Sequence, residues 1–172
     1  MPDDRIDRVI LAELQKNARI SYKDLAALTG AAPSTCLERV RSLRARGIIR
    51  GFRAEVDLPR LGRKLEALIA IRFRTHARDL VDPFVGYLLS LPETLGLFNV
   101  TGDDDYLLHV AVADADRLHA FVLDRLGSRP EVDHLRTALV YKHFRKPVIE
   151  PLDGLKLNRQ EQTSRPRRKE SV

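Results

Sequence analysis

The sequence predicts an α+β protein in which three helices precede a unit of alternating strands and helices. Apolar residues recur at helical spacing up to about residue 46. From residue 65 onward, stretches that alternate apolar and polar residues are separated by helical stretches in the order βαββαβ. That order is typical of the ferredoxin-like plan, a four-stranded antiparallel sheet with both helices on one face.

The first two helices are indicated by spacing and by capping residues. Residues 4–15 form the first, with one apolar face made of Ile6, Val9, Ile10 and Leu14. Ser21 is a suitable N-cap for the second, and Asp24 three residues later gives a weak variant of the capping box. Gly30 can adopt the positive φ that ends a helix.

The third predicted helix runs from Pro33 to Arg46 and has one buried and one polar face. Cys36, Val40 and Leu43 recur at i, i+4 and i+7 and therefore share the buried face. The other face is polar and basic, with Arg39 on its flank, and consists of Ser34, Thr35, Glu38, Arg39, Arg41 and Ser42. Two short helices followed by a strand, expected from Ile48 to Phe52, are typical of a winged helix-turn-helix, whose second helix enters the DNA major groove.

An ordinary helical hairpin with solvated charges is the alternative interpretation of this stretch. The charge distribution favours DNA. Residues 1–60 hold 12 Lys+Arg against 8 Asp+Glu, a net +4, whereas residues 61–150 hold 12 against 13, a net −1. The basic excess thus coincides with the predicted DNA-reading part.

The predicted organisation is a DNA-binding domain with its linker (residues 1–60), a ferredoxin-like domain (61–150) and a basic, disordered tail (151–172). Within the second domain, strands are expected at 65–74, 95–101, 106–112 and 132–143, with helices at 80–91 and 114–127. Alternate positions on both faces of the first strand are apolar, although two helices can cover only one face. We therefore expect a homodimer that covers the other face.

Composition excludes several classes of protein. No apolar run approaches about 18 residues, and the N-terminus is charged, so neither a membrane span nor a signal peptide is expected. The single Cys excludes an intramolecular disulfide framework and a multi-Cys zinc site, and it fits a cytoplasmic protein. No catalytic residues, metal ligands or cofactor are expected.

The chain resembles the Lrp/AsnC, or feast/famine, family of transcription regulators over about residues 4–148. The matching segments are IDRVILAELQKNARIS, DLAALTG, PSTCLERVRSL, GIIRGFRAEVDLPRLG and NVTGDDDYLLHV. The resemblance implies double-stranded DNA as a partner, dimers that assemble into tetramers or octamers, a nucleoid-associated location and a small amino-acid effector. The family often has Ser at the start of the reading helix, where this chain has Ala32.

The resemblance places the effector near the loop formed by Gly102, Asp103, Asp104 and Asp105. Gly102 permits a turn that exposes backbone N–H groups to a carboxylate, and Asp105 offers an acceptor for an ammonium group. Asp103 and Asp104 make the loop unusually acidic, which favours a basic or neutral ligand. A plain acidic hairpin turn is the alternative.

Two other functions remain open. An effector-independent nucleoid-organising protein would use the same residues. It would differ only in the ratio of its affinity for specific DNA sites to its affinity for other DNA. A sirohaem-decarboxylase-like enzyme would share the two-domain layout. Such an enzyme depends on His and Arg around a tetrapyrrole, and the histidines here are scattered without metal-ligand spacing at positions 76, 109, 119, 134 and 143.

Overall fold

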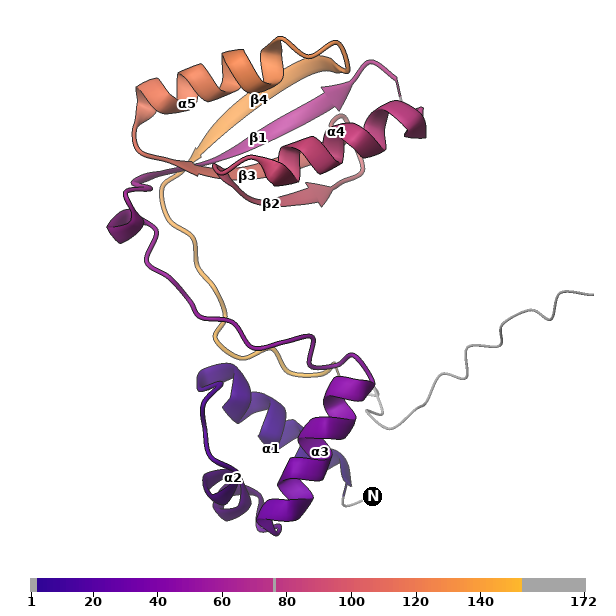
Figure 1. The fold of residues 1–172 in the computed structure, drawn as a ribbon, viewed down its shortest axis with the longest axis vertical. Helices are drawn as coiled ribbons and strands as arrows, with labels where there is room; N and C mark the ends of the chain where they lie inside the picture. The colour runs from indigo at the N-terminus through magenta and orange to yellow at the C-terminus, as the bar shows by residue number, and fades with distance from the viewer. Residues whose placement is uncertain (1–2, 76, 153–172) are drawn as a thin grey trace, which may run out of the picture. The chain divides into compact units, whose positions relative to one another are not determined.

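The computed structural model describes residues 3–75 and 77–152. These residues form two compact units, one made of residues 3–54 together with 145–152 and the other of residues 55–144 (Figure 1). The predicted tail lies outside the described residues apart from its first two positions. The fold is the predicted α+β combination of a helix-turn-helix and a ferredoxin-like sheet.

The first unit contains three helices: α1 (Asp3–Lys16), α2 (Tyr22–Thr29) and α3 (Pro33–Ala45). Their apolar stripes meet in one core, whose fully buried members are Ile10, Leu25, Cys36, Val40 and Leu43. The predicted capping is confirmed, because the Ser21 hydroxyl accepts a hydrogen bond from the Asp24 N–H at 3.1 Å. Gly30 ends α2 with a φ of 72°, a conformation that favours glycine.

The strand expected from Ile48 to Phe52 is absent from the described chain, so that prediction is wrong. The N–H groups of Ile48 and Ile49 both donate to the Leu43 carbonyl and thereby close the end of α3. Beyond Ile49 no strand among residues 3–75 and 77–152 pairs with the segment. A strand requires a ladder of hydrogen bonds to a partner, which local β propensity cannot supply.

The second unit contains strands β1 (Leu65–Phe73), β2 (Thr94–Asn99), β3 (Tyr106–Val112) and β4 (Val132–Val140) in one antiparallel sheet of order β2-β3-β1-β4. β4 ends three residues before the predicted position. Its last pair is Glu66 with Val140, and β1 begins at Leu65, so β4 has no partner beyond that point.

Two helices, α4 (Arg78–Ser90) and α5 (Ala115–Phe121), lie on the same face of this sheet (Figure 1). α5 continues without a break into the π-helix η2 (Val122–Gly127), while the short 3-10 helix η1 (Pro59–Leu61) precedes β1. Phe84 and Leu88 of α4 and Leu118 and Phe121 of α5 pack on alternate residues of β1 and β3. Inward residues of the central strands are Ala67, Ile69, Ile71, Phe73, Leu108 and Val110.

The opposite side of the sheet, called the outer face below, carries no helix within the described chain. The strand register places both apolar and charged residues on it. Its apolar members are Leu68, Ala70, Phe98, Leu107, Ala111, Ala138 and Val140. At one end it carries Arg72, His134 and Arg136, and near the other His109 lies 2.9 Å from the Glu66 carboxylate. Phe98 is 56% exposed, so the face holds an uncovered aromatic ring.

After β4 the chain returns to the first unit. The Gln15 side chain of α1 forms two hydrogen bonds with the Ile149 backbone, its amide donating to the carbonyl at 3.1 Å and its oxygen accepting from the N–H at 2.9 Å. One side chain therefore satisfies both backbone polar groups of one residue, which fixes the returning segment on α1.

Candidate functional site

The outward face of α3 is the first candidate site. Ser34, Glu38, Arg41 and Ser42 are exposed, while Thr35 and Arg39 are half-buried at its edges. The structure thus brings all six predicted residues onto the side of α3 that does not enter the core. A helix with hydroxyl, carboxylate and guanidinium groups on one accessible face can meet both base edges and phosphates.

The start of α3 lacks the usual side-chain cap. Ala32 occupies the N-cap position with extended backbone and makes no side-chain hydrogen bond, and Pro33 follows at the first helical position. The first N–H groups of a helix have no intrahelical partner. Ala32 has no side-chain oxygen that could accept a hydrogen bond from one of them.

A buried ion pair next to this helix was not predicted. The Asp7 side chain of α1 is fully buried, and its Oδ2 lies 3.3 Å from Nη2 of Arg46, directly after α3. Arg46 also donates from Nε to the Ser42 carbonyl at 3.3 Å. The sequence held a signal, because Asp7 precedes Ile10 by three residues and Leu14 by seven and so lies on the buried stripe of α1.

The loop between β2 and β3 is the second candidate site. Gly102 has a φ of 120°, which agrees with the predicted need for glycine at this turn. Asp103 is exposed, whereas Asp104 and Asp105 are half-buried. Among the hydrogen bonds of residues 3–75 and 77–152, none has the backbone N–H of Gly102, Asp103 or Asp104 as its donor.

Asp105 holds the hairpin in place. Its Oδ2 accepts the Phe73 N–H at 2.8 Å, and its own N–H donates to the Ile71 carbonyl at 2.9 Å. Asp105 directly precedes β3, so it continues the ladder beyond the first residue of that strand and ties the loop to the end of β1. The sequence suggested an ammonium acceptor at this position, but one carboxylate oxygen already has a backbone partner.

Asp104 forms an ion pair with Arg136 of β4, so two of the three loop carboxylates contact neighbouring strands. Arg136 is 65% exposed, which leaves its guanidinium accessible from outside. The loop is thus an acidic turn in which Asp103 is the most exposed carboxylate. Sequence reasoning missed Arg136 because it lies 32 residues away.

None of the described helices combines the length and the apolar character needed to cross a membrane.

Comparison with known proteins places both units in one family. Residues 3–50 match the family described as winged helix-turn-helix DNA-binding, and residues 66–148 match the Lrp/AsnC ligand binding domain. The transcriptional regulator AldR of Mycolicibacterium smegmatis is 37% identical over 142 residues, which cover 83% of each chain. The leucine-responsive regulatory protein of Escherichia coli K12 is 36% identical over 143 residues, covering 83% of this chain and 87% of that protein.

Solved structures give the same result. A transcriptional regulator of Neisseria meningitidis, solved as a complex with L-Met, superposes with a TM-score of 0.76 at 32% identity and covers 90% of this chain and 97% of that one. E. coli AsnC superposes with a TM-score of 0.77 at 28% identity, covering 86% and 98%. Sequence, fold and order of the two units agree, and the chain belongs to the Lrp/AsnC family of helix-turn-helix transcriptional regulators.

Proposed function

We propose that α3 reads double-stranded DNA from the major groove and that the protein regulates transcription in response to a small amino acid. The observation that supports the first part is the accessible face of α3, on which six polar or basic side chains surround a helix anchored by three buried residues. Ser34, Thr35 and Glu38 lie nearest the helix start and approach base edges. Arg39 and Arg41 meet phosphates.

Binding assays at several salt concentrations test this division of roles. Arg41→Ala should weaken binding to every sequence and reduce the salt slope by about one unit, because a phosphate contact releases one counterion. Thr35→Ala or Glu38→Ala should instead change the preference among sites, by about 1–3 kcal/mol for each lost base contact. Lys64→Ala is a charge-matched control, since Lys64 is exposed in the other unit. An unchanged salt slope in Arg41→Ala would contradict the docking geometry.

We propose a homodimer, and further assembly to tetramers or octamers, through the outer face. Seven apolar side chains, including Phe98 at 56% exposure, lie there without a covering helix among the described residues. Ala138→Arg should place a charge opposite Leu68 at the centre of this face and shift light scattering toward the monomer. Thr137→Arg is the control, because the adjacent residue points to the other side of the sheet. A wild-type monomer at micromolar concentration would refute the argument.

The effector, we propose, binds at the loop formed by Gly102, Asp103, Asp104 and Asp105. Its support is the free N–H edge of the turn, the exposed Asp103 and the related L-Met complex of the Neisseria regulator. Asp105 positions the loop, and Asp103 is the carboxylate open to an ammonium group. The loop holds three carboxylates, and Arg136 supplies a single positive charge beside them, so the net charge of the site is negative. A negative site favours neutral or basic amino acids.

Calorimetry against the twenty amino acids tests the effector loop. Asp103→Asn should weaken binding about tenfold while leaving the fold intact, because Asp103 is exposed. Ligand binding that is unchanged in Asp103→Asn and in Gly102→Ala would place the effector elsewhere. An absence of binding to any amino acid would favour the effector-independent nucleoid-organising function.

We propose a regulator without enzymatic activity, located in the cytoplasm in association with the nucleoid. His109, a buried histidine of β3, lies 2.9 Å from the Glu66 carboxylate on the outer face. A shifted absorbance spectrum after mixing with sirohaem would contradict this proposal and support the decarboxylase-like alternative.

A further inference from the structure

A second candidate ligand site lies in the 55–144 unit, at the end of the sheet opposite the Gly102–Asp105 loop. β2 and β3 meet that loop at one end, and at their other end they border a pocket of about 430 Å3. Its walls come from the segment before β1, the start of β2, the end of β3 and the helix pair α5 and η2. This volume falls within the range of small-molecule sites.

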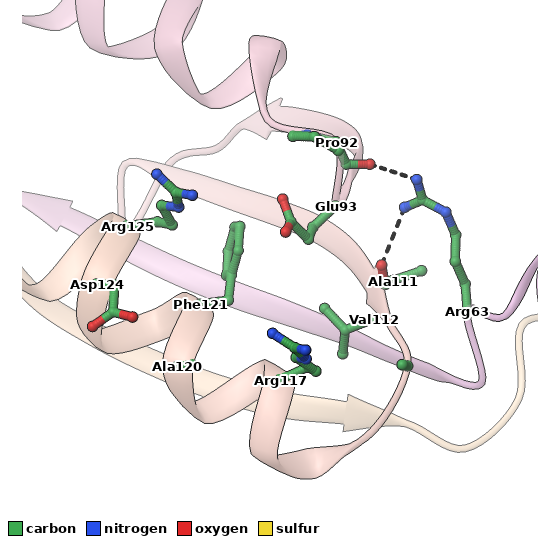
Figure 2. A pocket seen from close by; sticks show the side chains of 11 residues that line it. Arg63, Pro92, Glu93, Ala111, Val112, Arg117, Ala120, Phe121, Asp124 and Arg125 are labelled. Carbon is green, nitrogen blue, oxygen red and sulfur yellow. Dashed lines mark hydrogen bonds between the residues drawn. The ribbon is translucent and has the colours of Figure 1, made fainter.

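The pocket combines an apolar floor with a charged rim (Figure 2). Phe121 lies at its centre, beside Ala120 and Val112. Arg125 lies on one side of the ring and Arg117 and Arg63 on the other, with the Glu93 carboxylate between them. The remaining charged lining residue is Asp124.

Arg63 is a fixed cation at the rim. Its Nη1 donates to the Ala111 carbonyl at 3.1 Å and its Nη2 to the Pro92 carbonyl at 2.7 Å (Figure 2). Both acceptors are neutral, so they orient the guanidinium without cancelling its charge. Arg117 and Arg125, by contrast, are exposed on the helix.

The helix geometry brings the other lining residues to one side. Arg117, Ala120 and Phe121 are spaced i, i+3 and i+4 in α5 and therefore share one face, and Asp124 of η2 lines the pocket beside them. The wider turn of η2, which begins at Val122, brings Arg125 to the same pocket. Single π-helical turns of this kind frequently occur at functional sites.

No ion pair within 4.0 Å joins Arg117, Arg125, Glu93 or Asp124 to any side chain in the two described ranges. Three guanidinium groups and two carboxylates line the pocket, giving a net charge of +1. Guanidinium groups bind carboxylates with paired hydrogen bonds, and a carboxylate accepts from an ammonium group.

We infer that this pocket binds an amino acid with an acidic side chain. One carboxylate of the ligand binds Arg125, and the other binds Arg63 and Arg117 on the opposite side of the pocket. The ammonium group binds the Glu93 carboxylate. Such a ligand carries a net charge of −1, which complements the pocket. Its short carbon chain lies over Phe121. The site is separate from the effector loop, whose acidic residues favour the opposite ligand charge, and the inference does not depend on that loop binding anything.

Titration of the full chain with glutamate, followed by calorimetry and by amide NMR shifts, tests the inference. Glutamate should bind saturably and at least tenfold more tightly than glutamine, with shifts concentrated at Ala111, Val112 and Ala113. Glutarate, which lacks the ammonium group, should bind more weakly, and Glu93→Gln should abolish the preference for glutamate over glutarate.

Arg117→Gln and Arg125→Gln should each weaken glutamate binding at least tenfold. Both side chains are exposed, so the fold should persist, and the wild-type shifts locate the site without any variant. Lys64→Gln removes an equal charge from an exposed position beside the pocket and should leave binding unchanged. Three results would overturn the inference: no saturable binding, shifts centred on residues 102–105, or equal losses in Lys64→Gln and Arg117→Gln.

Discussion

Removing Arg46 should destabilise the DNA-binding unit (residues 3–54 and 145–152) while leaving the stability of the sheet unit (residues 55–144) unchanged. Asp7 is fully buried and Arg46 is 18% exposed, and their side chains approach within 3.3 Å. Arg46→Met keeps the length and apolar body of the side chain but removes its charge. The buried Asp7 carboxylate then loses its ion pair with the Arg46 guanidinium, which disfavours the folded state.

The size of the effect follows from this geometry. Breaking a buried pair by removing one partner costs about 3–5 kcal/mol. The separation of 3.3 Å is long for a charge-assisted hydrogen bond, and Arg46 keeps some access to water, so we expect the lower end, about 3 kcal/mol. A unit of roughly fifty residues is stable by only about 3–8 kcal/mol. Urea dependence of about 1 kcal/mol per molar gives a midpoint shift of about 3 M.

Urea titration followed by amide NMR reports both units separately, with signals from β1 and β3 as the internal reference. Arg44→Met is the matched control, because Arg44 is exposed two residues away and the charge change is identical. The double variant Asp7→Leu/Arg46→Met should recover most of the loss, since an apolar pair can replace a buried ion pair without penalty.

Two outcomes would refute the reasoning. The first is a midpoint for Arg46→Met that matches that of Arg44→Met within about 0.5 kcal/mol, the usual limit for surface substitutions. The second is a double variant no more stable than Arg46→Met, which would show that the cost arises from Arg46 packing rather than from the lost ion pair with Asp7.

Three other substitutions have expected outcomes. Ala32→Ser should supply the missing cap of α3 and stabilise the DNA-binding unit by about 1 kcal/mol in thermal melts, whereas Ala45→Ser should not. Asp105→Ala should destabilise the sheet unit by about 1–3 kcal/mol, because the Phe73 N–H loses its acceptor, while Asp105→Asn retains an acceptor oxygen and should cost less in urea titrations. Ser21→Ala should lower the stability of the DNA-binding unit by about 1 kcal/mol, measured in the same way.

The parts of the fold that depend on neighbouring residues were predictable from the sequence. The boundaries of β3, the Ser21 cap and the end of α2 at Gly30 all follow from local spacing and backbone preference. Asp114 likewise caps α5 by accepting the Arg117 N–H at 2.8 Å. All six predicted DNA-contacting residues lie on the outward side of α3 because helical periodicity alone separates its two faces.

The parts that depend on distant residues were not predictable. β4 stops where β1 begins, and the expected strand after α3 needs a partner strand that the described part of the chain does not supply. The partners of two carboxylates also lie far away in the sequence. Asp7 pairs with Arg46, 39 residues further along, and Asp105 accepts the N–H of Phe73, 32 residues before it. A sequence pattern shows that a carboxylate lies on a buried stripe or in a turn, but only the fold decides which group it contacts.

The two hydrogen bonds between Gln15 and Ile149 make the DNA-binding unit discontinuous in the chain. In sequence terms, the sheet unit is an insertion, entering after Ala54 and leaving at Phe144. Insertions of this kind can be exchanged when both junctions are kept. A chimaeric regulator with another protein's sheet unit should therefore replace residues 55–144 and retain the native residues that follow. A simple fusion at residue 60 would discard Ile149, the partner of Gln15.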